Sequence, residues 1–314
     1  MKIYHSTNTF NLTEKNSIIT IGTFDGVHIG HQEIIKNLVK SANSNNNKSL
    51  ILTFFPHPRM VLQKGGDLKL LTTLEEKIDL LEKTGLDYLI IEPFTKDFSR
   101  LTALDFVRDI LVEQLKLKKL VIGYDHHFGR NRKGNFEQLK EYGNVYGFEV
   151  EEIPAQDIQN VSVSSTKIRK ALTDGDIEKA NKYLGYEYIL TGKVIHGKGL
   201  GNKWNYPTIN INVDETYKLI PKSGVYIVKT TINNNNIFGI MNIGYRPTID
   251  GQHQTIEVHL LDFNADLYGE NIKVQLVYRL RDEQKFDSIK DLFLQIKSDE
   301  KKARELIITR KISF

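Results

Sequence analysis

Strand-like and helix-like segments alternate through the first half of this 314-residue chain, and that alternation most constrains its fold. The strand-like runs are short and apolar, at residues 17–21, 49–55, 88–91, 120–122 and 148–153. Strands that alternate with helices pair into a parallel sheet with right-handed crossovers. We therefore predict an α/β domain built on a parallel sheet.

Capping signals mark several of the helices between these strands. Thr73 and Glu76 have capping-box spacing, and Thr102 precedes another helix-like segment. A helix is expected after Gly134, and a further one from Asp176 to Leu184 that Gly185 ends.

A glycine-rich turn follows the first strand-like run and precedes a helix that we expect to begin near Gln32. Gly22, Gly26 and Gly30 let the backbone turn tightly and approach a ligand. The helix that follows directs its free N–H groups toward the same place. The turn therefore predicts an anion-binding site.

Two histidines enter this turn with H-x-G-H spacing, His28 and His31. Imidazole N–H groups there can donate hydrogen bonds to phosphate oxygens as charge develops on them. The alternative is a simple connection that carries two surface histidines. The combination of three glycines and two histidines favours phosphate chemistry.

Further polar groups follow later strands, where ligands bind in open parallel sheets. His57 and Arg59 end the second strand-like run, and residues 123–134 form a loop with basic side chains and glycines. Residues 163–169 place three hydroxyl side chains at a helix start, which fits a second phosphate cradle. A solvated loop and an ordinary helix cap are the alternatives for these two segments.

From Tyr188 onward the pattern changes to short β runs, and this change marks a domain boundary. We divide the chain into residues 1–185 and 186–314. Residues 233–236 form a hairpin turn, and a terminal helix at 288–308 is expected to cover one barrel opening. A six-stranded antiparallel β-barrel is predicted from candidate strands at 189–196, 208–212, 224–231, 237–243, 255–262 and 272–278.

The β region carries its own chemical groups. Thr208 and Asn210 offer two oxygen ligands on one strand face, which suits Mg²⁺ bound mostly by phosphate and water. The glycine loop at 197–201 can wrap phosphates with its amides. Strand alternation turns Glu257 and His259 away from the apolar face of Ile256 and Val258. A solvated strand face is the alternative for Glu257.

These segments resemble those of the bacterial bifunctional riboflavin kinase/FMN adenylyltransferases, also called FAD synthetases. The matching runs are the turn at 22–31, the loop at 123–134, S-S-T-x-I-R from Ser164, P-T-x-N from Pro207 and E-x-H-x-x-D from Glu257. The resemblance implies a Rossmann-like nucleotidyltransferase domain and a riboflavin kinase barrel. Together they would convert riboflavin to FMN and FMN to FAD, using Mg²⁺ and ATP.

The resemblance also implies roles for individual residues. Glu257 would be the base for the riboflavin hydroxyl, and His28 and His31 would act in adenylyl transfer. The ATP phosphates of that step would meet Gly22, Phe24, Asp25, Gly26, Gly30, Ser164, Ser165, Thr166 and Arg169. The flavin nucleotide would meet His57, Arg59, Asp125, Phe128 and Asn131. The kinase would bind ATP and flavin through Gly197, Gly199, Gly201, Pro207 and Arg281, and metal through Thr208 and Asn210. His126 and Asn205 depart from the family pattern, which has an aromatic residue and a glycine there.

Composition sets the remaining limits. A net charge of +4 makes no case for nucleic-acid binding, and the chain has no cysteine. No apolar run approaches the ~18 residues that a membrane span needs. We expect a cytoplasmic enzyme with small-molecule substrates, and the sequence leaves self-association open. Two other readings remain: a single-activity nucleotidyltransferase with an accessory barrel, and a flavin-binding protein without catalysis.

Overall fold

The computed structural model describes residues 1–12, 16–63, 68–123, 128–129, 134–153, 163–197, 206–248 and 251–309, with the backbone alone described at 246–248 and 251–253. The chain forms two compact units, Met1–Ser165 and Thr166–Phe314. Each unit is described by itself. Among the described residues, no helix combines the length and hydropathy that a membrane crossing requires.

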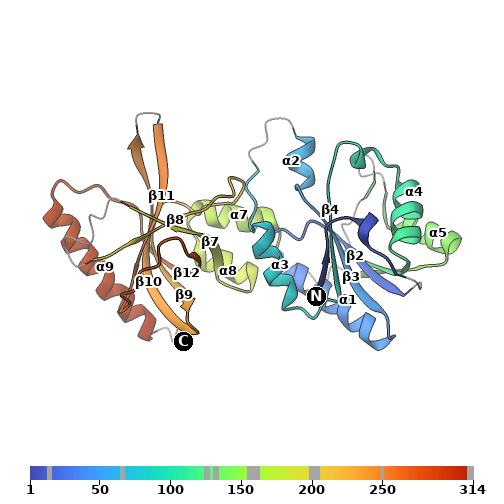
Figure 1. The fold of residues 1–314 in the computed structure, drawn as a ribbon, viewed down its shortest axis with the longest axis horizontal. Helices are drawn as coiled ribbons and strands as arrows, with labels where there is room; N and C mark the ends of the chain where they lie inside the picture. The colour runs from blue at the N-terminus through green and yellow to red at the C-terminus, as the bar shows by residue number, and fades with distance from the viewer. Residues whose placement is uncertain are drawn as a thin grey trace. The chain divides into compact units, whose positions relative to one another are not determined.

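The first unit is built on a parallel six-stranded sheet with the order β1-β4-β3-β2-β5-β6 (Figure 1). Its strands are β1 (Lys2–Tyr4), β2 (Ser17–Ile21), β3 (Lys48–Phe54), β4 (Tyr88–Glu92), β5 (Leu117–Gly123) and β6 (Glu149–Ile153). All five predicted strands are present. Strand β1 is absent from the sequence-based prediction because its 3 residues are too few to show a pattern.

Helices cover both faces of this sheet (Figure 1). One face packs against α1 (Ile29–Ser44) and α3 (Leu74–Glu82), and the other against the π-helix η3 (Phe106–Gln114) and α5 (Phe136–Tyr146). The remaining helical segments are short: η1 (Thr7–Thr9), α2 (Pro58–Leu62), η2 (Phe98–Arg100) and α4 (Ala103–Asp105). With both faces covered, a parallel sheet buries its strands completely, as the fully buried β2 shows.

The predicted helix signals correspond to real caps, with one shift. Thr73 forms a capping box with Glu76, and Thr102 caps α4. The helix expected near Gln32 instead begins at Ile29, because the His28 side chain is its N-cap and accepts from the His31 N–H. The turn is therefore shorter than predicted.

The second unit begins within α7 (Ser165–Asp174) and continues with α8 (Ile177–Leu184), a closed antiparallel barrel and α9 (Ile289–Thr309). Asn181 of α8 bonds the barrel backbone at Leu276 and Tyr188. The structure thus groups α7 and α8 mainly with the barrel, whereas the sequence division at residue 185 places them in the first domain.

The barrel has the strand order β10-β11-β8-β7-β12-β9, which closes the sheet on itself. Asn233 and Asn234 both have positive φ and join β9 to β10 in the predicted hairpin turn. The six strands are β7 (Tyr188–Ile195), β8 (Ile209–Asn212), β9 (Gly224–Ile232), β10 (Asn235–Thr248), β11 (Gly251–Leu260) and β12 (Asn271–Arg281).

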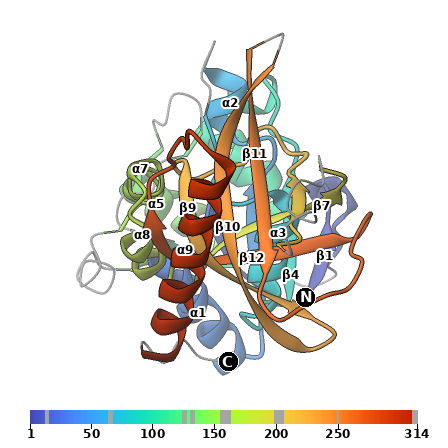
Figure 2. The ribbon, with the colours of Figure 1, turned by 90° about the vertical axis from the view of Figure 1, so that its left-hand side faces the viewer.

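Helix α9 lies along the outside of the barrel, in front of β9 and β10 in Figure 2. Its Ala303 and Ile307 pack on Val225 and Ile227 of β9, which alternate with the barrel-facing Tyr226. The expectation that this helix covers a barrel opening was wrong. The apolar face of α9 packs instead against apolar residues on the outer face of β9.

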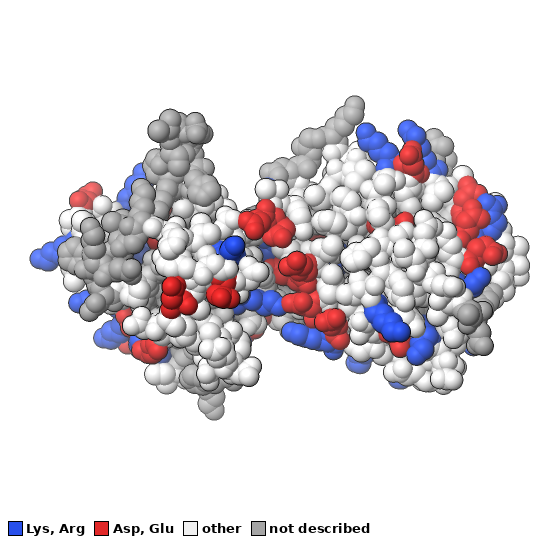
Figure 3. Space-filling view, in the orientation of Figure 1, with Lys and Arg blue, Asp and Glu red and all other residues white. Residues whose placement is uncertain are grey.

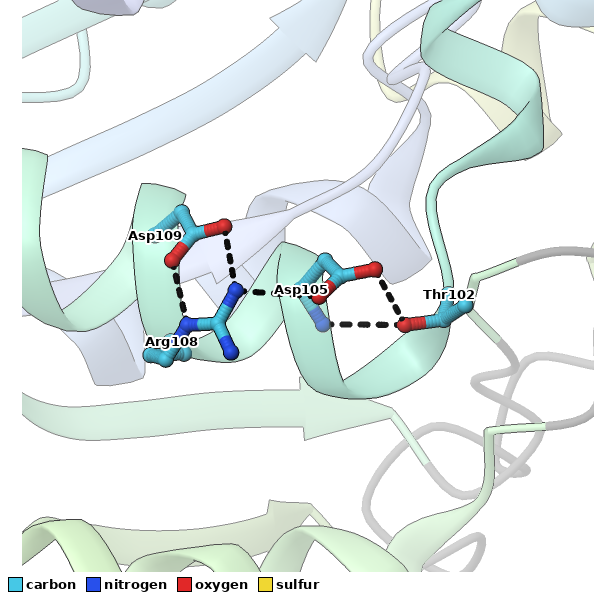
Figure 4. A network of polar contacts seen from close by, with 4 residues as sticks. All are labelled: Thr102, Asp105, Arg108 and Asp109. Carbon is cyan, nitrogen blue, oxygen red and sulfur yellow. Dashed lines mark hydrogen bonds and ion pairs between the residues drawn. The ribbon is translucent and has the colours of Figure 1, made fainter.

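Charged side chains of both signs are interspersed on the face drawn in Figure 3, as a net charge of +4 would suggest. Most ion pairs lie on the surface. An example is Arg108 of η3, which pairs with Asp105 and Asp109 beside the Thr102 cap (Figure 4).

The ion pair between Arg281 of β12 and Asp299 of α9 differs because it is largely buried, with side chains 17% and 7% exposed. Replacing Arg281 by Met would leave the Asp299 carboxylate buried without its guanidinium partner. We expect Arg281→Met to lower the free energy of unfolding by about 3 kcal/mol. Urea unfolding followed by circular dichroism, without substrates, measures this.

The matched control is Arg108→Met, which removes an exposed ion pair and should have a much smaller effect. Equal losses in the two variants would show that the Arg281–Asp299 pair does not anchor α9.

Candidate functional site

The glycine-rich turn leaves the sheet where the strand order reverses. Strand β3 lies on one side of β2 and β5 lies on the other, so the end of β2 is the switch point of the sheet. In open parallel sheets, ligands bind beyond the carboxyl ends of strands at such a point. The predicted anion site therefore lies where this fold class places its ligands.

The backbone of the turn adopts conformations that cost energy. Phe24 and Val27 have φ values of 46° and 35°, and Gly26 has 81°. Left-handed φ is uncommon for a non-glycine residue and a clear outlier for β-branched valine, at a cost of about 1–3 kcal/mol each. Phe24 and Val27 are buried in the core, which helps to fix this geometry.

Side chains from distant segments hold the turn in place. The buried Asp25 carboxylate accepts from the N–H groups of Leu71 (2.9 Å) and Thr72 (3.4 Å). The Thr72 hydroxyl accepts from Gly26 N–H at 3.3 Å. Lys77 Nζ donates to the Thr23 carbonyl at 2.8 Å.

A further bond ties the start of α7 to the same turn. Ser165 Oγ donates to the Asp25 carbonyl at 3.0 Å. The structure thus brings two of the segments predicted to bind ATP phosphates into direct contact. The buried Asp25 carboxylate binds backbone N–H groups, and its role toward ATP phosphates stays a prediction.

His28 and His31 lie face to face at the beginning of α1. Their ring centroids are 3.6 Å apart with an interplanar angle of 14°, and Phe24 meets the His31 ring edge-on at 5.1 Å. Among the described residues, the buried His31 Nδ1 has no hydrogen-bond partner. The half-buried His31 ring therefore meets any ligand through its opposite edge, which carries Nε2.

The surroundings disfavour positive charge on His31. Burial lowers the pKa of His31 well below its ordinary value, and the neighbouring His28 and Lys77 lower this pKa further. Burial also lowers the pKa of Lys77 to about 8, against the opposing effect of Asp25. At neutral pH, His31 is thus neutral and Lys77 still largely charged.

The other residues predicted for the first site occupy varied environments. Gly30 lies buried in the first turn of α1, while Ser164 and Thr166 are exposed and Arg169 is half-buried, near the α7 start. His57 caps α2, and its Nδ1 accepts from the exposed Arg59 N–H at 3.1 Å. Cβ on Gly22 would come within 3.1 Å of the Phe24 ring.

Phe128 is 7% exposed and packs on Phe106 within the sheet core, with its backbone bridged to Gly134. Asp125, His126 and Asn131 lie outside the described residues.

Thr72 and Lys77 are missing from the sequence-based site. A signal for Lys77 does exist in the sequence, since Leu74, Lys77, Ile78 and Leu81 recur at helical spacing on one face. A lysine on the apolar face of a helix is expected to be buried, and a buried ammonium group requires hydrogen-bond acceptors or an opposite charge. No comparable signal marks Thr72.

The barrel brings Asn210 and Glu257 together as cross-strand neighbours. Asn210 of β8 pairs directly with Glu257 of β11, and Asn242 of β10 pairs with Glu257 from the other side. Side chains opposite each other in antiparallel strands have Cβ atoms about 4.5–5.5 Å apart. The expected alternation is confirmed, because Ile256 and Val258 point into the barrel and are buried.

Thr208 lies two residues before Asn210, at the rim of a cavity of about 260 Å³. The cavity is lined by Thr208, Pro207 and Ile209, by barrel-facing side chains, and by residues 263–268. At Gly197, Cβ would come within 2.1 Å of Asn210 Nδ2. Because Gly197 has no side chain, the Asn210 amide can occupy this space.

Thr208 and Asn210 are the residues here that could hold a metal. A hydroxyl and an amide oxygen fit Mg²⁺, whose remaining ligands are usually phosphate and water. In the described part of the chain, no group of three or more histidine or carboxylate residues could hold a metal ion. Gly199, Gly201 and Asn205 lie outside the described residues.

His259 and Tyr206 form a network beside Glu257. His259 Nδ1 lies 2.8 Å from the Pro207 carbonyl, and the Tyr206 ring lies 5.1 Å from His259. Tyr206 OH donates to Glu300 of α9 at 3.0 Å. Arg281, predicted to bind ATP or flavin, is engaged by Asp299, and its ligand role stays a prediction.

The low pKa of His31 predicts its behaviour in acid. The folded protein binds this proton more weakly than the unfolded chain, whose histidines titrate near about pH 6.5. We expect the His31 ring to keep neutral-imidazole shifts in nitrogen NMR spectra through pH 6 and to titrate normally in urea. Its contribution to stability then falls as the pH drops below about 6.5. Titration of folded His31 at its ordinary pKa would contradict this account of its surroundings.

Family models match almost the whole chain. The model for FAD synthetase matches residues 11–167, and the model for riboflavin kinase matches residues 184–307. A crystal structure of a protein described as a macrolide-efflux protein from Streptococcus pneumoniae has a TM-score of 0.86 and 30% identity, over 96% of this chain and 98% of that one.

Two curated relatives carry the same description, bifunctional riboflavin kinase/FMN adenylyltransferase. The protein from Listeria monocytogenes is 38% identical over 304 residues, covering 96% of each chain. The protein from Escherichia coli K12 is 37% identical over 293 residues, covering 93% of each chain. The two family models match successive parts of the chain, and both relatives match it over more than nine-tenths of its length. The chain therefore belongs to the bifunctional riboflavin kinase/FMN adenylyltransferase family.

Proposed function

We propose that this chain makes FAD from riboflavin in two reactions, one in each unit. The barrel phosphorylates riboflavin with ATP to give FMN, and the α/β unit adenylylates FMN with ATP to give FAD and pyrophosphate. We propose residues 1–185 for the adenylyltransferase and residues 186–314 for the kinase. A cytoplasmic location is part of the proposal, and the absence of cysteine fits a reducing compartment.

The observation that carries the proposal is the pairing of Asn210 with Glu257 on one face of the barrel. An accessory barrel would not need a carboxylate directly opposite an amide on neighbouring strands. Together with the histidine pair at the sheet switch point, this pairing supports one site in each unit. It favours two activities over a single-activity nucleotidyltransferase or a flavin-binding protein without catalysis.

In the kinase reaction, Glu257 takes the proton from the attacking riboflavin hydroxyl. The hydroxyl oxygen then bonds to the γ-phosphorus of ATP, and ADP leaves. Such transfers depend mainly on positioning and on stabilisation of spread charge, so the protein needs no nucleophilic side chain. The paired strands β8 and β11 fix the Glu257 backbone relative to Asn210.

We propose that Thr208 and Asn210 hold Mg²⁺ in the kinase. The ion, when bound, neutralises charge on the ATP phosphates. Gly197 contributes by leaving room for the Asn210 side chain, and Pro207 contributes through its carbonyl, which orients His259.

In the adenylyl transfer, an FMN phosphate oxygen bonds to the α-phosphorus of ATP, and pyrophosphate leaves. His28 and His31 donate hydrogen bonds to the phosphate oxygens of ATP. We propose that Gly22, Gly26 and Gly30 allow the close approach, and that Ser164, Thr166 and Arg169 bind phosphates from the α7 start. His57 and Arg59 are proposed to contact the flavin nucleotide at the end of β3.

His28→Ala tests the assignment of adenylyl transfer to the first unit. Removing one donor to the developing charge should lower the rate of FAD formation from FMN by about 100- to 1,000-fold. FMN formation from riboflavin should stay close to normal. Separation of the flavins by chromatography measures both rates, with exposed His5→Ala as the control. FAD formation at the normal rate would remove His28 from the mechanism.

Glu257→Gln tests the kinase base. Glutamine keeps the size of the side chain but cannot accept the proton, so kinase turnover should fall by about 100- to 10,000-fold. FMN supplied from outside should still become FAD. Riboflavin and ATP affinities should be measured for the variant, with exposed Glu270→Gln as the control. Near-normal turnover would exclude Glu257 as the base and make His259 the next candidate.

A further inference from the structure

Helix α3 carries a lysine, Lys77, on its buried side, and this lysine contacts the glycine-rich turn that leads to His28 and His31. Lys77 is 4% exposed, and lysine is rarely buried to this degree. Leu81, on the same face of the helix, is fully buried in the sheet core. An apolar residue would fill this position without the cost of taking an ammonium group out of water.

The first turn of α3 and the residues before it place the Lys77 side chain. The Thr73 capping box fixes the start of the helix, with Glu76 Oε2 accepting from Thr73 N–H at 2.9 Å. Just before it, Leu71 and Thr72 bind the Asp25 carboxylate, and Thr72 also binds Gly26. Segment 71–77 therefore binds the turn through several hydrogen bonds, and Lys77 is the one positively charged residue of this segment.

The Lys77 ammonium donates to a carbonyl of the strained turn. Its Nζ lies 2.8 Å from the Thr23 oxygen, one residue before left-handed Phe24. Thr53 Oγ1 donates to the same oxygen at 3.3 Å. This carbonyl thus has two donors, and the stronger one carries charge.

The charge of Lys77 also acts on His31. Among the described residues, the charges that act on His31 are those of His28 from its own turn and Lys77 from α3, and Asp25 acts on Lys77. A nearby ammonium disfavours a second positive charge on the imidazole. A neutral imidazole carries one N–H group, which can donate a hydrogen bond.

We propose that Lys77 is a positioning residue for adenylyl transfer, which holds the glycine-rich turn, and with it His28 and His31, through the Thr23 carbonyl. The proposal rests on the proposed function of the first unit. It assigns to α3 a part in the reaction through the turn and through His31, without contact between Lys77 and substrate.

The test compares Lys77→Met, which removes the charge at similar length, with Lys77→Arg, which keeps it. Lys83→Met is the matched control, because Lys83 lies exposed at the end of the same helix. Three quantities are measured on the full chain: kcat and KM for FAD formation from FMN, the rate of FMN formation from riboflavin, and the NMR titration of His31.

For Lys77→Met we expect kcat for FAD formation to fall by about 10- to 100-fold, as a displaced catalytic turn would cause. The titration midpoint of His31 should rise, since a neighbouring positive charge is lost. FMN formation should be unchanged. Lys77→Arg should keep the low midpoint and recover part of kcat, and Lys83→Met should match the original protein.

Two results would overturn the proposal. One is FAD formation by Lys77→Met within about twofold of normal while the original protein makes FAD. The other is an equal loss of kcat in Lys77→Met and Lys77→Arg, which would leave Lys77 a purely structural part. If the original protein makes no FAD, the proposed function itself fails, and this outcome is distinct from both.

Discussion

The first unit depends on how the chain leaves strand β2. Three residues of the turn adopt left-handed backbone, two of them without the freedom of glycine, so the turn cannot hold its shape alone. Asp25, Thr72, Lys77 and Ser165 supply the bonds that fix it. The stacked histidines follow directly, and His28 caps the helix that begins there. Local strain is thus balanced by contacts from segments far along the chain.

In the second unit, regular strand pairing positions the side chains. The proposed kinase residues lie on paired strands, and the register of β8 with β11 sets Asn210 opposite Glu257. A shift of one residue would turn Glu257 into the barrel and Ile256 outward, which burial of the apolar face prevents. The proposed kinase site therefore depends on the same hydrophobic pattern that closes the barrel.

Much of this architecture is predictable from local sequence. Strand and helix alternation, the Thr73 capping box and the Asn233–Asn234 turn are local signals, and each corresponds to the observed element. Contacts between distant segments are not local signals. The pairing of Lys77 with Thr23, the ion pair of Arg281 with Asp299 and the outer position of α9 depend on packing that no short pattern contains.

The central claim is that the two reactions take place at two separate sites. It is tested most directly by mixing two variants, one with Glu257→Gln and one with His28→Ala, and supplying riboflavin, ATP and Mg²⁺. Each variant alone should make little FAD from riboflavin. The mixture should make FAD at a rate that rises with protein concentration, because FMN released by one chain reaches the other. Loss of FAD formation from supplied FMN in Glu257→Gln, or loss of FMN formation from riboflavin in His28→Ala, would contradict two separate sites.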